Sequence, residues 1–404
     1  MIMNNQNAAF EKLSRLKVGA LFMEMGTGKT KVALDLISSK NGKIDYILWI
    51  CPYSLKGEIE AERQKWHSEL TIDVIGCESI GASDRVYVET MRKVTGRRTF
   101  IVVDESLKIK NKDAKRTERI LKLGQEATYK LILNGTPLSK NVLDLWTQMQ
   151  FLSPKILQMN YNEFKNTYCE YYVRGRLRGL VKKQHNVEHL ISKIEPYIFD
   201  SALELGKQKH YSDYVYKMDN VEEYNDLKEK YLNVQIFDFM AISQILQQYY
   251  CKSCEKVGII QNLINEINDR VIVFVKFLKS IPAGAAAITG DMCTQERETV
   301  IARFREGNIK VLYMTYGCGA FGLNLQFCKH MIFADHTFDY AQRIQAEARI
   351  FRLGQTDDVH YYNLWCDCGL ERLIKGSLDK KTNLLTEVKK EILKKGEEEW
   401  LKNL

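Results

Sequence analysis

Two features that would place this chain in a membrane or a secretory compartment are missing from its sequence. It contains no run of about 18 consecutive apolar residues, the length that a membrane-spanning helix needs. Residues 1–10 are polar and lack the basic start and apolar run of a signal peptide. We therefore expect a soluble, monomeric protein of the cytoplasm with no membrane partner.

The sequence also lacks a set of zinc ligands. Its ten cysteines are scattered, and the close pairs Cys251/Cys254 and Cys366/Cys368 are far apart in the chain. A structural zinc site needs four suitably spaced cysteine or histidine ligands, and neither pair has a spaced histidine partner. We therefore expect reduced, mostly buried thiols rather than a zinc site.

The chain also lacks a large net charge of either sign. Lys and Arg number 59 against 51 Asp and Glu, which gives a formal net charge of +8. This excess only mildly favours a polyanionic partner. The length of 404 residues exceeds what one hydrophobic core usually organises, so two or three domains are expected.

Apolar runs of strand length alternate with segments of helical period, a pattern typical of α/β proteins. The expected strands are residues 20–23, 46–51, 99–103 and 130–133, and later 271–275, 285–289, 310–314, 330–334 and 359–364. Between the two groups the chain is charged, rich in tyrosine and mostly helical. We therefore predict two α/β lobes, residues 1–153 and 256–404, joined by a mainly helical connector over 154–255. The last lobe is expected to end in an amphipathic helix over 383–404.

A glycine-rich segment, residues 25–30, follows an expected strand and opens an expected helix. This setting is typical of a loop that binds phosphates through backbone N–H groups at a helix N-terminus. The predicted nucleotide contacts are Gly26, Thr27, Gly28, Lys29 and Thr30. Lys29 would bind the β- and γ-phosphates, and the hydroxyl of Thr30 would bind Mg²⁺. The eight-residue form of the motif has glycine at the position of Met23, so this is a shorter GxGKT variant.

An acid pair follows the expected strand 99–103. Asp104 would bind Mg²⁺ and Glu105 would polarise the attacking water, as in other nucleotide-hydrolysing enzymes. An acid pair alone could merely cap a helix, but with Lys29 upstream it indicates a site for ATP and Mg²⁺ and catalysis of ATP hydrolysis.

The remaining motifs resemble, in order, those of the Swi/Snf family of DNA translocases in helicase superfamily two. The resemblance covers about residues 6–374 and is carried by segments 104–111, 134–138, 143–146, 151–152, 288–291, 319–325 and 345–355. The last of these contains the diagnostic ending RxGQ, residues 352–355. The resemblance implies two RecA-like lobes and a compact member of bacterial or phage type.

The resemblance also implies residue roles. Arg349 and Arg352 lie three apart, so on a helix they would share one face and could stabilise charge on the γ-phosphate; the resemblance makes Arg352 the arginine finger. Gln6 is a candidate for reading adenine. Contacts with DNA, or coupling to them, are implied for Pro52, Thr136, Thr289, Thr315, Gly322, Asn324 and Gln355.

One residue departs from the family pattern. Leu107 stands where the DE-x-H motif has a histidine that the resemblance links to communication between the ATP site and the third motif. Leucine neither donates nor accepts a hydrogen bond. Coupling is therefore expected to use other contacts or to be looser.

The sequence leaves three functions open. The first is an ATP-dependent translocase on double-stranded DNA, and the second is a DNA or RNA helicase that separates strands. The third is a nucleotide-switched binding protein without turnover, which the retained Lys29, Asp104, Glu105 and Arg352 disfavour. A basic segment in the connector, which includes Arg174, Arg176, Arg178, Lys182 and Lys183, is either a phosphate contact or a solvated face.

Overall fold

The computed structural model describes residues 4–135, 142–171, 181–201, 203, 206–232, 239–317, 323–352 and 354–379. The chain forms two compact units, Met1–Glu204 and Leu205–Leu404. Each unit has one six-stranded sheet, and a separate two-stranded sheet is also present in the described residues.

The sheet of the first unit has the strand order β3-β2-β4-β5-β1-β8, and every neighbouring pair is parallel. Its strands are β1 (Val18–Met23), β2 (Tyr46–Cys51), β3 (Asp73–Gly76), β4 (Thr99–Val103), β5 (Tyr129–Leu133) and β8 (Ile198–Ser201). Because all six strands run in the same direction, their carboxyl ends lie at one edge of the sheet.

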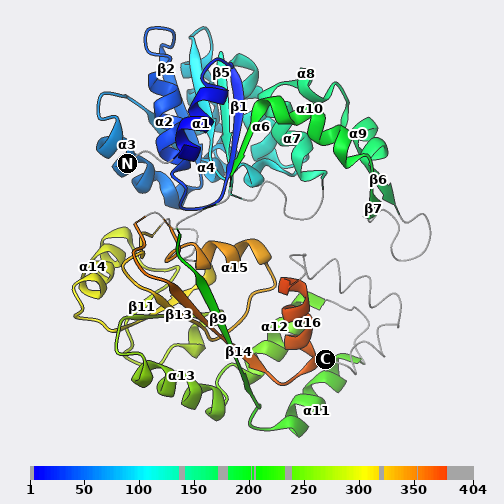
Figure 1. The fold of residues 1–404 in the computed structure, drawn as a ribbon. Coiled ribbons are helices and arrows are strands. Elements are labelled where there is room, and N and C mark those ends of the chain that lie inside the picture. Colours follow the sequence, from blue (N-terminus) through cyan, green and yellow to red (C-terminus); the bar gives the residue numbers. More distant parts are fainter. Residues whose placement is uncertain are drawn as a thin grey trace. The chain divides into compact units, whose positions relative to one another are not determined.

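Helices cover this sheet (Figure 1). They are α1 (Asn4–Leu13), α2 (Lys29–Ser38), α3 (Lys56–Trp66), α4 (Cys77–Ala82), α5 (Asp84–Val94), α6 (Lys115–Glu126), α7 (Asp144–Leu152), α8 (Pro154–Leu157), α9 (Tyr161–Tyr168) and α10 (Val187–Ile194). Both faces of the sheet are buried, since Leu48 and Ile50 of β2 belong to one apolar cluster and Ile47 and Trp49 belong to another. This burial explains why the strands are nearly continuous apolar runs.

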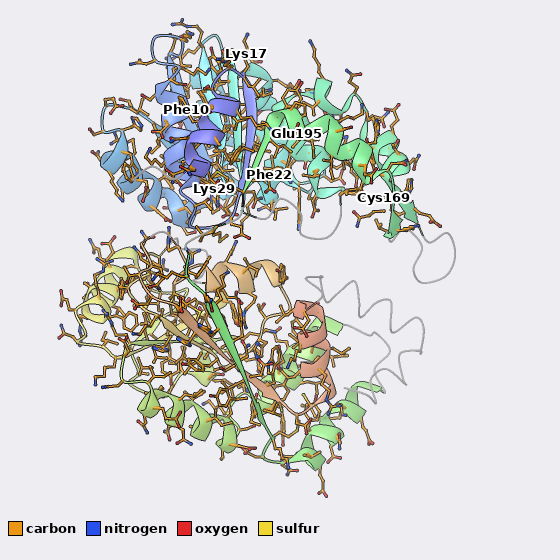
Figure 2. The ribbon with its side chains drawn as sticks, viewed as in Figure 1. Phe10, Lys17, Phe22, Lys29, Cys169 and Glu195 are labelled. Carbon is orange, nitrogen blue, oxygen red and sulfur yellow. The ribbon has the colours of Figure 1, made fainter. Side chains whose placement is uncertain are left out.

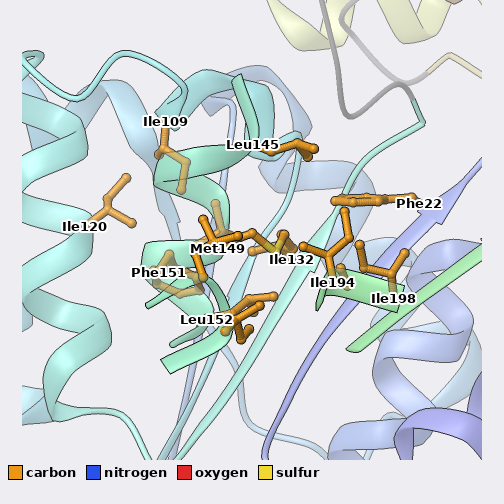
Figure 3. Packing of buried hydrophobic residues seen from close by; sticks show 14 of the residues in the cluster. Phe22, Ile109, Ile120, Ile132, Leu145, Met149, Phe151, Leu152, Ile194 and Ile198 are labelled. Carbon is orange, nitrogen blue, oxygen red and sulfur yellow. The ribbon is translucent and has the colours of Figure 1, made fainter. Parts of the chain in front are cut away.

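Figure 3 shows part of the first cluster around Ile132 of β5. Met149 and Leu152 of α7 and Ile194 of α10 belong to the same cluster. Residues on both sides of the 153/154 boundary therefore share one core.

The sheet of the second unit has the order β11-β12-β10-β13-β14-β9 and is also parallel throughout. Its strands are β9 (Lys209–Tyr216), β10 (Val271–Val275), β11 (Ala287–Ile288), β12 (Val311–Thr315), β13 (His330–Phe333) and β14 (Val359–Cys366). Its helices are α11 (Val221–Leu232), α12 (Phe239–Tyr250), α13 (Cys254–Glu266), α14 (Thr294–Arg305), α15 (Tyr340–Glu347) and α16 (Gly369–Asp379).

The prediction of two α/β lobes with parallel sheets is confirmed. The segment 154–255 is divided between the two units, because β8 joins the first sheet and β9 joins the second. It also contains an antiparallel pair, β6 (Cys169–Tyr171) with β7 (Val181–Gln184). The amphipathic helix expected over 383–404 lies outside the described residues. Within the described part of the chain, no helix has the length and apolarity to cross a membrane.

Candidate nucleotide-binding site

The glycine-rich segment predicted to bind phosphates connects the end of β1 to the start of α2. Gly26 and Gly28 adopt left-handed backbone conformations with φ of 79° and 86°, which only glycine reaches without strain. Gly28 is the residue immediately before α2. The loop therefore turns sharply into a helix N-terminus, where N–H groups and the helix dipole favour an anion.

The loop is held by contacts on two sides. Gln6 of α1 is buried and donates a 2.8 Å hydrogen bond from Nε2 to the carbonyl oxygen of Thr27. The hydroxyl of Thr27 donates to the carbonyl oxygen of Glu24 at 2.7 Å. The carboxylate of Glu24 accepts a hydrogen bond from the backbone N–H of Leu203, just after β8. These contacts fix the loop independently of the α2 helix.

The ammonium group of Lys29 lies within the loop. It donates to the carbonyl oxygens of Met23 at 2.8 Å and Glu24 at 3.1 Å. Figure 2 labels Lys29 on α2 at the end of β1. A β-carbon added to Gly135, which follows β5, would lie 3.6 Å from Lys29 Nζ and 3.1 Å from Met25 Cγ. The glycine of the third motif therefore lies close to the phosphate loop, and a β-carbon there would require the side chain of Met25 to shift slightly.

The acid pair lies at the same edge of the sheet. Asp104 follows β4, is 8% exposed, and its backbone N–H donates to the carbonyl oxygen of Ile50 at 2.8 Å. Burial and the neighbouring charge of Glu105 raise the pKa of Asp104 to about 7, while the charge of Lys29 acts in the opposite direction. Glu105 adopts a left-handed conformation with φ of 49°, which is uncommon for a residue with a side chain.

These residues suit a magnesium ion bound together with nucleotide phosphates. Among the described residues no cluster of three or more His, Cys, Asp or Glu could hold a metal ion by itself. Mg²⁺ in nucleotide sites is usually held by one or two protein oxygens together with phosphates and water. The hydroxyl of Thr30 and the carboxylate of Asp104 are hard oxygen ligands of this kind, and a bound cation would favour the ionised form of the buried Asp104.

Two of the residues with implied DNA roles lie at the corresponding edge of the second sheet. Thr315 ends β12 and Thr289 follows the neighbouring strand β11. In the first unit, Pro52 is buried directly after β2. Asn324 is half-buried in a segment without regular structure. Thr136 and Gly322, like Arg174, Arg176 and Arg178, lie outside the described residues, whereas Lys183 is exposed on β7.

The prediction that Arg349 and Arg352 share one face of a helix is wrong. Helix α15 ends at Glu347, and both arginines lie in the turn that follows. After α15 the backbone N–H groups of Arg349 and Ile350 donate to residues three positions earlier, and the carbonyl oxygen of Arg349 accepts a hydrogen bond from Leu325 N–H. Arg349 is 7% exposed, and Arg352 is half-buried and donates to the carbonyl oxygen of Leu323 at 3.4 Å.

Gln355 organises this turn. Its Nε2 donates to the carbonyl oxygens of Cys328 and Ile350 at 3.0 and 3.1 Å. Its Oε1 accepts from the N–H groups of Thr356 and Asp357 at 3.0 and 3.1 Å. The side chain is buried and bonded to backbone at both ends, so its contacts hold the arginine-bearing turn in place.

One set of contacts in the first unit was missed by reasoning from the sequence. Ser106, Asn134 and Gln148 are buried polar residues that hydrogen-bond with one another next to the acid pair. Gln148 stands within an apolar helix, and a polar residue in such a place is a signal for a buried partner.

Comparison with known protein families finds a match for each of the two parts of the chain. A family model described as the SNF2-related domain matches residues 10–247, and one described as the helicase conserved C-terminal domain matches residues 243–354. The chain is 26% identical over 334 residues to a Bacillus subtilis protein named uncharacterized ATP-dependent helicase YqhH, covering 72% of this chain and 59% of that protein.

Two further similarities extend the comparison. A Drosophila melanogaster protein named SWI/SNF-related matrix-associated actin-dependent regulator of chromatin subfamily A-like protein 1 is 23% identical over 314 residues, covering 72% of this chain and 41% of that protein. The solved SWI2/SNF2 ATPase core of Sulfolobus solfataricus in complex with dsDNA is 22% identical, with 99% of this chain and 94% of that chain covered and a TM-score of 0.44. The chain thus spans 59% and 41% of the lengths of the two curated relatives.

Proposed function

This chain belongs to the SNF2-related family of helicase-like proteins, and from that membership we propose that it hydrolyses ATP to move along double-stranded DNA without separating its strands. The observation that carries the proposal is the edge of the first sheet. There the left-handed glycines, Lys29, the buried Asp104 and the backbone of Gly135 follow the neighbouring strands β1, β4 and β5.

Each residue at this edge has a part in the proposed hydrolysis. The N–H groups of the loop and the Lys29 ammonium bind and orient the phosphates, since the N–H dipoles and the ammonium charge both favour an anion. Mg²⁺, held by Thr30 and Asp104, would neutralise charge on the transferred phosphoryl group. Glu105 accepts a hydrogen bond from the attacking water and orients it. Gln6 reads the adenine base from its position beside the loop.

The second unit supplies positive charge for the transition state. We propose Arg352 as the residue that stabilises charge developing on the γ-phosphate and Arg349 as its neighbour in the same turn. The four backbone hydrogen bonds of Gln355 support this role, because a finger that is held in one geometry loses little conformational entropy on binding.

Double-stranded DNA is proposed as the polymer on two grounds. The motifs resemble those of a family of DNA translocases, and Thr315, the last residue of β12, carries a hydroxyl that can donate a hydrogen bond to a phosphate. Phosphates repeat regardless of sequence, so a motor that binds only them needs no base contacts. Separation of strands would in addition require about 1.4 kcal/mol per stacked base step.

The test is ATP turnover by the purified protein with duplex DNA, single-stranded DNA or RNA, together with two displacement assays. The proposal expects the largest stimulation by duplex DNA, a steep loss of stimulation as salt rises, and displacement of a triplex-forming strand without displacement of a duplex strand. Lys29→Ala is the negative control in the turnover assays and in both displacement assays.

Other outcomes distinguish the alternatives. Robust displacement of a duplex strand, or stimulation by RNA alone, would support a strand-separating helicase. Tight ATP binding with no turnover under any condition would support a nucleotide-switched binding protein.

A further inference from the structure

A short chain of buried polar side chains lies behind the acid pair in the first unit. Ser106 Oγ donates a 2.6 Å hydrogen bond to Oε1 of Gln148 and accepts a 3.3 Å hydrogen bond from Nδ2 of Asn134. The three side chains are 0%, 0% and 1% exposed. At such burial each polar group needs a partner, so the chain is expected to hold one arrangement.

The three residues come from three functional segments. Ser106 directly follows the acid pair and starts the 3₁₀ turn Ser106–Ile109. Asn134 follows β5 and begins the third motif, and its backbone N–H donates to the carbonyl oxygen of Leu21 in β1 at 3.0 Å. Gln148 lies within α7, where its Nε2 donates to the carbonyl oxygen of Asp144 at 2.8 Å.

The third motif contacts the phosphate loop on its other side. Gly135 follows Asn134, and a β-carbon placed on it would lie 3.1 Å from Met25 Cγ and 3.6 Å from Lys29 Nζ. A shift of Asn134 would therefore move backbone that touches the loop, and a shift of Ser106 would move the acid pair.

Glu105 is held between two fixed points. On one side the N–H of Asp104 is bonded to Ile50, and on the other the side chain of Ser106 is bonded to α7 and to Asn134. Glu105 itself has a φ of 49°. A residue with a side chain remains in this sparsely populated region only where its surroundings hold it there.

We propose that Ser106 is a positioning residue that joins the acid pair to the third motif and to α7. Leu107 is half-buried and has no polar side-chain atom, whereas the residue before it supplies both a donor and an acceptor. The inference rests on the ATPase function proposed above, and it adds the residue through which the two motifs communicate.

The first test compares Ser106→Ala with a matched control, Thr147→Val, in the full chain. Thr147 is adjacent to Gln148 and equally buried, but its hydroxyl has no hydrogen-bond partner among the described residues. Removing that hydroxyl at nearly constant volume should leave turnover within twofold of wild type. Ser106→Ala should lower kcat in the presence of duplex DNA about tenfold or more and leave the KM for ATP within twofold.

Two further variants separate positioning from simple loss of packing. Gln148→Met removes the acceptor at the other end of the bond and should give the same fall in kcat, and the double variant should be no worse than either single variant. Ser106→Cys keeps a weak donor and acceptor, so it should recover part of the rate and also serves where Ser106→Ala does not fold. Equal kcat values for wild type and both Ser106 variants would overturn the proposal.

Hydrogen exchange tests the link without relying on DNA. A non-hydrolysable ATP analogue should slow amide exchange in both α2 and α7 of the wild type. In Ser106→Ala the protection of α2 should remain and that of α7 should be lost. If duplex DNA does not stimulate ATP turnover by the wild type, the proposed translocase function is wrong. The amide exchange of α7 in the presence of the ATP analogue still tests the role of Ser106 in that case. Unchanged protection of α7 in Ser106→Ala would overturn that role.

Discussion

The side-chain amide of Gln6 donates a 2.8 Å hydrogen bond to the carbonyl oxygen of Thr27, so the first helix of the chain directly supports the phosphate loop. Gln6 is 5% exposed, although it lies only six positions from the start of the sequence. A residue in this place can influence both the loop and the base of a nucleotide bound to it.

The first prediction concerns Gln6→Ala. Loss of one buried hydrogen bond, worth about 1 kcal/mol, should raise the KM for ATP about fivefold and leave kcat nearly unchanged. If Gln6 also reads adenine, the preference for ATP over GTP should fall. The measurement is steady-state turnover with both nucleotides, with the exposed neighbour variant Asn7→Ala as control. An unchanged KM and an unchanged ATP preference would contradict both roles.

A second prediction separates binding from hydrolysis at the acid pair and the loop. Lys29→Ala should abolish turnover and weaken ATP binding, because it removes the ammonium group that lies within the loop. Glu105→Gln keeps the shape but cannot act as a base, so it should bind ATP and fail to hydrolyse it. Equilibrium ATP binding and phosphate release measure the two steps. Wild-type turnover by purified Glu105→Gln would exclude the assigned role.

The strands show how far the sequence predicts the fold. All nine predicted strands appear in the two sheets, some with small shifts of their ends, for example 310–314 as β12 (Val311–Thr315). They are apolar on both faces, and this pattern is easily recognised. The strand β9, Lys209–Tyr216, was missed because most of its residues are exposed and its sequence KHYSDYVY is polar. It lies at the end of the sheet and is fixed by its pairing with β14 over eight residues.

The residues of the candidate site were likewise only partly predictable from the sequence. The phosphate loop and the acid pair were predictable because each is a local pattern beside an apolar strand. The sequence interpretation places Arg349 and Arg352 on one face of a helix. In the structure the helix ends at Glu347, and the carbonyl oxygen of Arg349 is bonded to Leu325 N–H from a segment distant in sequence. No local pattern in the sequence contains that contact. Gln148 within an apolar helix signals a buried partner, but not that the partner is Ser106, which is 42 positions away.

The third prediction concerns the arginine of the second unit. Arg352→Ala should fold and bind ATP but hydrolyse it about 10³-fold more slowly or worse, by analogy with other arginine fingers. Arg372→Ala is the matched control, because Arg372 is an exposed arginine of the same unit whose bond to Asp367 is on the surface. Single-turnover hydrolysis is the measurement. A loss of less than about tenfold would mean that Arg352 is structural.

The last prediction concerns three histidines stacked across neighbouring strands of the second sheet. His360 of β14 lies between His330 of β13 and His210 of β9, with ring centroids 5.2 and 4.9 Å apart and ring planes inclined by less than 20°. Burial lowers the pKa of His330 to about 4, and the charge of His360 acts in the same direction. Burial also lowers the pKa of His360, with the charge of His210 adding to it.

The sign of the pH dependence follows from these shifts. In the unfolded chain a histidine takes up its proton near pH 6.5, whereas the folded protein resists protonation until the pH is much lower. The unfolded state therefore binds more protons between about pH 6.5 and 4, and stability that is fully present above this range is lost as the pH falls through it. The carboxylates of Asp269 and Asp358 favour the protonated rings and oppose the effect, while Lys329 strengthens it.

We expect the free energy of unfolding in urea to fall by about 1 kcal/mol more in the wild type than in His330→Phe when the pH is lowered from about 7.5 to 5.5. Phenylalanine keeps a flat ring against His360 but takes up no proton. His185→Phe, in the first unit, is the control for removing a histidine elsewhere and should show the wild-type dependence. Identical pH profiles for the wild type and His330→Phe would mean that the stack is protonated equally in the folded and unfolded states, in which case the stacked arrangement contributes nothing to acid sensitivity.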